Sequence, residues 1–207
     1  GRGALHIRMT QDGRPVDLVN AHLKSKLLTF PRPGGTSFTP RDEAERAQVA
    51  GIALRRRTAE VVTVRLWVTA LLTGNNRTTL LLLGDFNDVP EAQTSLILTG
   101  PPGSESGTLG FDRPDRGDAV RLFNLAPLIA PDRRFSRVHR GRGELLDQIF
   151  ASEECFPVGP DNRRQLPAVD SHVDFARQLP SIGENPAERA REIAPDHAPV
   201  VATFDVG

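Results

Sequence analysis

The pattern of apolar and polar residues predicts several short strands that end in polar side chains. The clearest is the run of four leucines at residues 80–83, which has the length of a buried strand. Gly84 then permits a turn, and Asp85 and Asn87 follow it. Positions i and i+2 project to the same side, so we expect this carboxylate and this carboxamide to share one space. An Asx turn is the plainer alternative, and the segment alone does not favour either.

A second strand is predicted at residues 16–23, where apolar and polar residues alternate as in a half-buried strand. Asn20 and His22 stand near its C-terminal end. The residues just before it read Thr-Gln-Asp-Gly-Arg-Pro, and the pair Asp12 and Gly13 is typical of a hairpin turn. The pattern therefore places a second set of polar side chains at the end of a strand.

Two more segments end the series. Residues 145–150 are apolar apart from Asp147 and Gln148, and an ionised carboxylate in a buried strand needs a partner. Residues 194–204 bring Asp196 and His197 to the start of a last apolar strand. We expect His197 to pair with Asp147.

A long helix is predicted between the second strand and the leucine strand. Thr39 offers a capping hydroxyl, Pro40 suits the first turn, and acidic residues follow. Apolar residues then recur at helical spacing, which predicts packing against a sheet. This stripe consists of Ala47, Ala50, Leu54, Val61, Val64, Val68 and Leu71. Residues 74–76 end the helix, and the order helix then strand suits a layered α/β domain.

Two long irregular segments follow, at residues 100–117 and 156–195. Both are rich in proline, and long loops in a compact domain are often functional, so we expect substrate selectivity there. Residues 188–192 are expected to form a short helix. His172 is expected to be a surface residue and not a ligand.

Composition limits the function classes. The 26 basic and 26 acidic residues give a net charge of zero, so the chain as a whole does not attract nucleic acid, which disfavours a non-specific nuclease. Arginines do cluster locally, most simply on solvated faces. The clusters are at residues 55–57, 133–134, 140 with 142, and 163–164. Arg140 and Arg142 precede the Asp147 strand, so this pair is placed to approach an anionic substrate.

The single cysteine, Cys155, excludes an intramolecular disulfide and a zinc cluster of cysteines, and we expect it to be a structural thiol. The longest apolar stretch, residues 61–72, is shorter than a bilayer span and contains Arg65, so no transmembrane helix is expected. The sequence does not indicate whether the protein is cytoplasmic or secreted. With 38% hydrophobic residues, the 207 residues can bury one sizeable core, which we assign to a single domain over residues 1–207.

The four polar strand ends, taken in order, resemble the endonuclease/exonuclease/phosphatase superfamily of metal-dependent phosphoesterases, and bacterial members in particular. The similarity extends from about Leu18 to Phe204. Its motifs are Asn20-Ala21-His22-Leu23, Gly84-Asp85-Phe86-Asn87, Leu146-Asp147-Gln148-Ile149 and Asp196-His197-Ala198-Pro199-Val200. Gln148 stands where histidine is usual, and Pro195 where serine is usual. Neither difference removes a catalytic group.

This resemblance implies a four-layer α/β/β/α sandwich and hydrolysis of a phosphoester with Mg²⁺, or with Mn²⁺ or Ca²⁺ in its place. In that reaction Asp85 orients or deprotonates the attacking water, and Asn87 holds the water or a phosphoryl oxygen. His197, oriented by Asp147, donates to the scissile phosphate. The remaining roles are phosphate binding or leaving-group protonation by His22, support of His22 by Asn20, and metal binding by Asp196.

The resemblance also implies that part of the domain is missing. The family has two strands before the Asn-x-His-Leu motif, one of which carries the glutamate that is the main metal ligand. Only Asp12 and Asp17 precede Asn20 as carboxylates, and neither can replace this glutamate. We therefore expect an N-terminally truncated domain with a long inserted loop at 156–195 and an incomplete metal site. An exposed sheet edge or face would then favour self-association or a missing partner segment.

Two alternatives to an active phosphoesterase stay open. One is a catalytically incomplete fragment or pseudoenzyme, which follows from the missing glutamate. The other is a calcineurin-like dinuclear phosphoesterase, which also uses a Gly-Asp motif but needs a Gly-Asn-His motif that this sequence does not contain. The substrate could be DNA, RNA, an inositol phosphate, a sphingolipid headgroup or a small diester.

Overall fold

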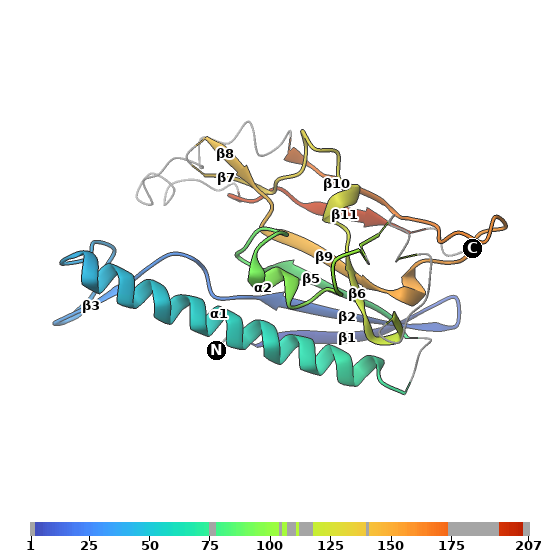
Figure 1. Cartoon of the computed structure of the whole chain (residues 1–207), viewed down its shortest axis with the longest axis horizontal. Helices are drawn as coiled ribbons and strands as arrows, with labels where there is room; N and C mark the ends of the chain where they lie inside the picture. Colours follow the sequence, from blue (N-terminus) through green and yellow to red (C-terminus); the bar gives the residue numbers. More distant parts are fainter. Residues whose placement is uncertain are drawn as a thin grey trace.

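The computed structural model shows a mixed α/β domain built on one five-stranded sheet of order β1-β2-β5-β9-β6 (Figure 1). It describes residues 3–74, 78–103, 105–106, 111, 118–139, 141–173 and 195–204. The sheet strands are β1 (Ala4–Gln11), β2 (Arg14–His22), β5 (Thr79–Asp85), β9 (Asp147–Ser152) and β6 (Leu122–Asn124). The expected α/β class is confirmed. The helix expected at 188–192, and Arg140, lie outside the described residues.

Shorter elements complete the chain. The remaining strands form two-stranded ribbons: β3 (Phe30–Arg32) with β4 (Gly35–Ser37), β7 (Arg137–His139) with β8 (Arg142–Glu144), and β10 (Ala168–Ser171) with β11 (Val200–Thr203). The described helices are α1 (Glu43–Leu72), α2 (Gln93–Leu96), and the 3-10 turns η1 (Asp118–Val120), η2 (Ala126–Leu128) and η3 (Glu153–Cys155).

The first two strands form the expected hairpin. Asp12 and Gly13 connect them with φ angles of 49° and 77°, the left-handed pair that a tight hairpin turn requires. Strand β2 then pairs in parallel with β5, and β5 pairs antiparallel with β9. The two predicted strands at 16–23 and 80–83 are thus neighbours at the centre of the sheet.

Helix α1 covers one face of this sheet. The C-terminal half of the expected stripe is correct, because Val61, Val64 and Val68 pack with Val19 and Leu82 of the sheet. The N-terminal half is wrong, since Leu54 is 50% exposed and Ala47 is exposed, while Ala53 and Arg57 are buried instead. In Figure 1 the start of α1 extends past the ends of β2 and β5 and lies beside β3, so the five-stranded sheet does not continue beneath that part.

The cap of α1 also differs from the expected one. The side chain of Asp42 accepts a hydrogen bond from the backbone N–H of Glu45 and caps the helix, whereas Thr39 lies outside it. The carboxylate suits the positive end of the helix dipole. Asp42 directly precedes the first helical residue and can therefore cap the free N–H groups of the first turn, whereas Thr39 lies three residues before Asp42.

The other face of the sheet is covered over β5, β9 and β6 by the β10–β11 ribbon. Leu81, Ile149 and Phe123 of the sheet pack with Val169 and Ala202 of the ribbon. Strand β10 lies inside the segment expected as a loop at 156–195. The full four-layer sandwich stays a prediction. The two α-helices that the structure describes, α1 and α2, pack on the same face of the sheet, so the second helical layer of such a sandwich is not among the described residues.

The half of that face formed by β1 and β2 is open. Leu5, Ile7 and Met9 of the edge strand β1 are 60%, 47% and 44% exposed. An open apolar edge of this kind is the association hazard expected from the sequence, and self-association stays a prediction. Within the described residues, no helix has the length and hydropathy of a membrane span.

Gly84 is a position at which this architecture leaves no room for a side chain. Its φ is 135°, and a Cβ there would lie 2.0 Å from the carbonyl oxygen of Ala21 on the paired strand. We expect Gly84→Ala to reduce the free energy of unfolding by on the order of 3 kcal/mol, measured by urea denaturation.

Gly51→Ala is the matched control, because this helical position has no atom within 4 Å of the added Cβ. We expect it to stabilise the protein by about 0.5–1 kcal/mol. Equal stability of the two variants would contradict the tight approach of β2 and β5.

Candidate active site

Three of the predicted residues lie in one row across the sheet. His22 of β2 is paired with Asp85 of β5, and Asp85 is paired with Asp147 of β9. Directly paired residues project to the same face, and this row lies on the face opposite α1. The C-terminal ends of β2 and β5 and the start of β9 meet at the left of Figure 1. The convergence expected from the sequence is present.

The turn after β5 is fixed by the Asp85 carboxylate itself. The backbone N–H of Asn87 donates to Oδ1 of Asp85 at 2.8 Å, and the amide Nδ2 of Asn87 donates to Oδ2 at 3.0 Å. Nδ2 also donates to the carbonyl oxygen of Leu23 at 3.0 Å, and Asn87 has a φ of 53°. The segment is therefore an Asx turn, one of the two explanations weighed from the sequence, and the functional role of Asp85 and Asn87 stays a prediction.

His197 and Asp147 form the expected pair. Nδ1 of His197 lies 2.6 Å from Oδ2 of Asp147. A carboxylate accepts hydrogen bonds, so Nδ1 carries the proton and Nε2 is left for a ligand. His197 enters from the loop before β11, which connects the ribbon to the row on the sheet.

Ser136 fastens this pair, and no pattern in the sequence pointed to it. Its Oγ accepts hydrogen bonds from the backbone N–H groups of Leu146 and Asp147, both at 3.1 Å. Its carbonyl oxygen accepts from the N–H of Ala198 at 2.6 Å. Ser136 is fully buried, so one residue holds both chain segments that carry the pair.

His22 stands at the solvent side of the row. Its Nε2 lies 3.4 Å from Oδ2 of Asp85, and its side chain is 53% exposed. Asn20 projects from the same face of β2, opposite Leu83, and is exposed. Within the described part of the chain Asn20 makes no hydrogen bond to His22, so its supporting role stays a prediction.

Burial and neighbouring charges set the protonation of the row. Burial raises the pKa of Asp85 above its ordinary value of 3.8, and the Asp147 charge adds to this, while the Asn87 N–H, His197 and His22 oppose it. For His197, burial alone would lower the pKa. The hydrogen bond and charge of Asp147, with the charges of Asp196 and Asp85, raise it overall. Asp85 is thus a stronger base than a free carboxylate, and His197 favours its cationic form.

The same residues offer ligands for a cation. Atoms of Asp85, Asp147 and His197 lie within 4.8 Å of one another. The two carboxylates suit a hard ion such as Mg²⁺, which also keeps several waters. Asp196, assigned to the metal from the resemblance, does not belong to this group, and its metal role stays a prediction.

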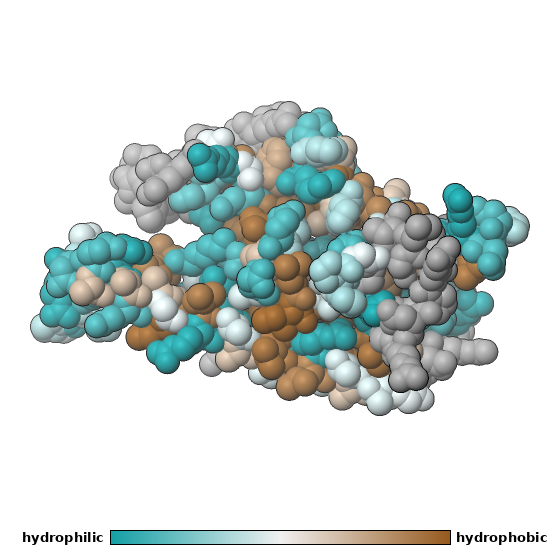
Figure 2. Space-filling view, viewed as in Figure 1, coloured by the Kyte–Doolittle hydropathy of each residue, from teal (hydrophilic) through white to brown (hydrophobic). Residues whose placement is uncertain are grey.

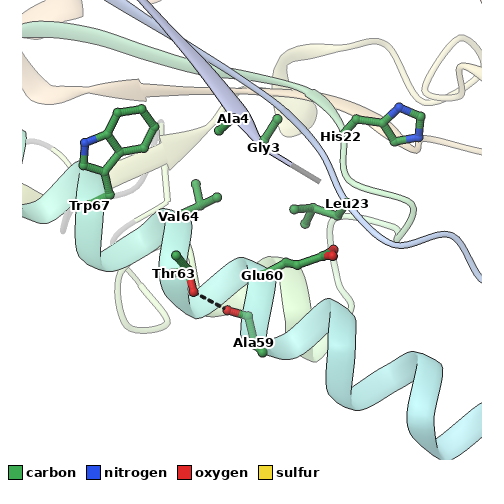
Figure 3. Close-up of a pocket in the computed structure, with 10 residues that line it drawn as sticks. Gly3, Ala4, His22, Leu23, Ala59, Glu60, Thr63, Val64 and Trp67 are labelled. Atoms are coloured by element: carbon green, nitrogen blue, oxygen red, sulfur yellow. Dashed lines mark hydrogen bonds between the residues drawn. The ribbon is translucent and has the colours of Figure 1, made fainter. Parts of the chain in front are cut away.

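The His22 side chain is 53% exposed at this end of the sheet. In Figure 2 the surface around β3 and the start of α1 projects to the left, at the side where β2 and β5 end. A separate cavity of about 370 Å³ lies between β1, β2 and α1. Figure 3 shows the His22 ring pointing away from it, and its lining is mainly apolar. This cavity is on the opposite side of the sheet from Asp85 and Asp147.

Comparisons with known proteins give a remote likeness. No family model and no curated protein matches the chain. Among solved structures, truncated Caenorhabditis elegans TDP2 matches at 15% identity and a TM-score of 0.49, over 97% of this chain and 59% of that chain. Beta toxin 275-280 from Staphylococcus aureus matches at 11% identity and a TM-score of 0.40, over 82% of this chain and 46% of that chain.

This chain therefore spans about half to three fifths of the structures it resembles. Because the TM-scores lie below 0.5, an assignment of activity has to rest on the residues of this chain.

The histidine–carboxylate pair can be tested by titration. In metal-free protein kept in EDTA, we expect Asp147→Asn to lower the pKa of His197, followed by NMR of the imidazole Cε1–H. Asp170→Asn is the matched control, because Asp170 pairs with Arg133 on the surface. An unchanged His197 pKa in Asp147→Asn would contradict the 2.6 Å contact.

The raised pKa of His197 also links the pair to stability. Its stabilising contribution is complete below the unfolded-state pKa near 6.5, and it is lost as pH rises through the higher folded-state pKa. We expect the stability advantage of the wild type over His197→Gln to shrink across that window, measured by denaturation at several pH values. An advantage that grows with pH would contradict this sign.

Proposed function

We propose that this chain carries the hydrolytic site of a divalent-metal-dependent phosphoesterase, with Mg²⁺ as the expected ion. The observation that supports the proposal most is the single row of His22, Asp85 and Asp147, with His197 held against it. A phosphoester resists attack because its oxygens are anionic, so a site must activate water and neutralise charge. The row and His197 bring a carboxylate base and an imidazole that favours its cationic form to one end of the sheet.

Each residue has a role that its contacts support. Asp85, with its raised pKa, accepts a proton from the attacking water or orients it. The amide Nδ2 of Asn87 donates to Asp85 and to Leu23, which favours a role in holding Asp85 in place. These two bonds occupy Nδ2 and leave the side-chain oxygen of Asn87 unused. The role assigned here therefore differs from the expected one, in which Asn87 donates to a phosphoryl oxygen.

The two histidines are assigned to the phosphate group. His197, protonated at Nδ1 against Asp147, donates from Nε2 to a phosphoryl oxygen. His22, exposed beside Asp85, is available to bind phosphate or protonate the leaving oxygen. Both assignments are proposals that substitution of each histidine can test.

Asp85 and Asp147 would hold the metal ion, whose chemistry is to withdraw charge from a phosphoryl oxygen and acidify a bound water. The site then needs further oxygen ligands from water or from another segment. This need favours one alternative, a catalytically incomplete fragment or pseudoenzyme, because the cation group within the described residues contains no glutamate.

Hydrolysis of bis(p-nitrophenyl) phosphate with Mg²⁺ or EDTA tests the proposal. We expect Mg²⁺-dependent release of nitrophenol, reduced about 100-fold or more in His197→Asn, since loss of one hydrogen-bond donor to the charge that develops in the transition state costs about 10²–10³-fold. His172→Asn is the matched control, because His172 is exposed and outside the row. We expect it to keep wild-type activity.

Equal activity of His197→Asn and His172→Asn would reject the assigned site. A folded wild-type chain with no turnover would instead favour the incomplete fragment. Retention of full activity in EDTA would reject the metal.

A further inference from the structure

Asp88, three residues after Asp85, holds two cations on one carboxylate. Nζ of Lys26 lies 2.8 Å from its Oδ1, and Nε of Arg57 lies 3.2 Å from its Oδ2. The hydroxyl of Thr94 donates to the same Oδ2 at 2.7 Å. The cluster therefore carries one more positive than negative charge.

The side chains of Arg57 and Lys26 differ in how deeply they are buried. Arg57 is 5% exposed and also reaches the carbonyl oxygen of Lys24, at 3.2 Å, so it is locked below the loop. The Lys26 side chain is 48% exposed. A lysine is a compact charge on a flexible stem, so its ammonium can exchange partners.

Asp88 stays satisfied if Lys26 leaves. Its Oδ2 keeps Thr94 and Arg57, and its Oδ1 keeps the N–H of Val89 at 3.2 Å. Removing the partner of a buried charge is costly, but here the buried guanidinium remains. The exchange of Lys26 from Asp88 to another anion therefore leaves no buried charge unpaired.

The loop that carries Lys26 runs along the catalytic turn. His22 contacts Asp85, and the N–H of Leu23 donates to the carbonyl oxygen of Asp85 at 2.9 Å. The carbonyl oxygen of Asp88 accepts from Nε2 of the buried Gln148 at 2.7 Å, which fixes the turn to β9. Lys26, four residues after His22, thus lies beside the turn that follows Asp85, where it contacts Asp88.

From this arrangement we infer that Lys26 is a binding residue for a second phosphate of the substrate, beside the scissile one. In the free protein Asp88 holds the ammonium in place, and the second phosphate takes it over. The inference rests on the proposed function for the place of the scissile group. It narrows the substrate to phosphoesters that carry a further phosphate.

Ligand binding tests this without any turnover. Isothermal titration with Mg²⁺ present compares thymidine 3′,5′-bisphosphate with thymidine 5′-monophosphate, which differ only in the second phosphate. We expect the wild type to bind the bisphosphate roughly tenfold tighter, the size of one charge-assisted hydrogen bond. Lys26→Met should remove this preference, and Lys26→Arg should restore most of it.

Lys24→Met is the matched control, since it removes a lysine from the same loop whose Nζ donates to the backbone oxygens of Ser25 and Leu27. We expect it to keep the preference. A wild type without preference, or a preference unchanged in Lys26→Met, would overturn the inference. If binding follows the expectation while no phosphodiester is hydrolysed, the proposed function fails and the Lys26 site stands.

Discussion

The pairing of β5 with both of its neighbours is the constraint on which the candidate site depends. Parallel pairing with β2 and antiparallel pairing with β9 bring His22, Asp85 and Asp147 to one row, although they are far apart in sequence. Helix α1 buries the opposite face through Val64 and Val68 and so keeps that register in place. The positions of these three polar side chains thus follow from the strand pairing of the sheet and from the packing of the core on its other face.

The last residue of β5, Asp85, fixes the turn that follows the strand. Asp85 supplies the acceptors that close its own turn, so the carboxylate that we propose as the base also shapes the chain around it. Ser136 plays the corresponding part for the other half, because it ties the backbone of Asp147 to that of Ala198 beside His197. Backbone contacts of this kind position the reactive groups without using their remaining lone pairs.

Strand ends and the Asp147–His197 pair could be predicted because both follow from local rules, namely apolar runs, turn residues and the cost of an unpaired carboxylate. The missed features depend on tertiary context. The burial of Arg57 in place of Leu54 reflects where the sheet ends beneath α1. Strand β10 has a pairing partner about thirty residues further along the chain, beyond any local pattern.

The alternation of faces along β2 has a consequence for how this sequence can change in length. Loss of a single residue between the hairpin turn and His22 would turn the imidazole to the helix side and bring Leu23 opposite Asp85 in its place, whereas loss of two would keep His22 on its present face. Insertions in the stretch between Lys26 and Asp42 meet no such parity rule, because within the described parts of the chain β3 and β4 pair with each other and with no other strand. Length variation among descendants of this gene should therefore collect there and avoid β2.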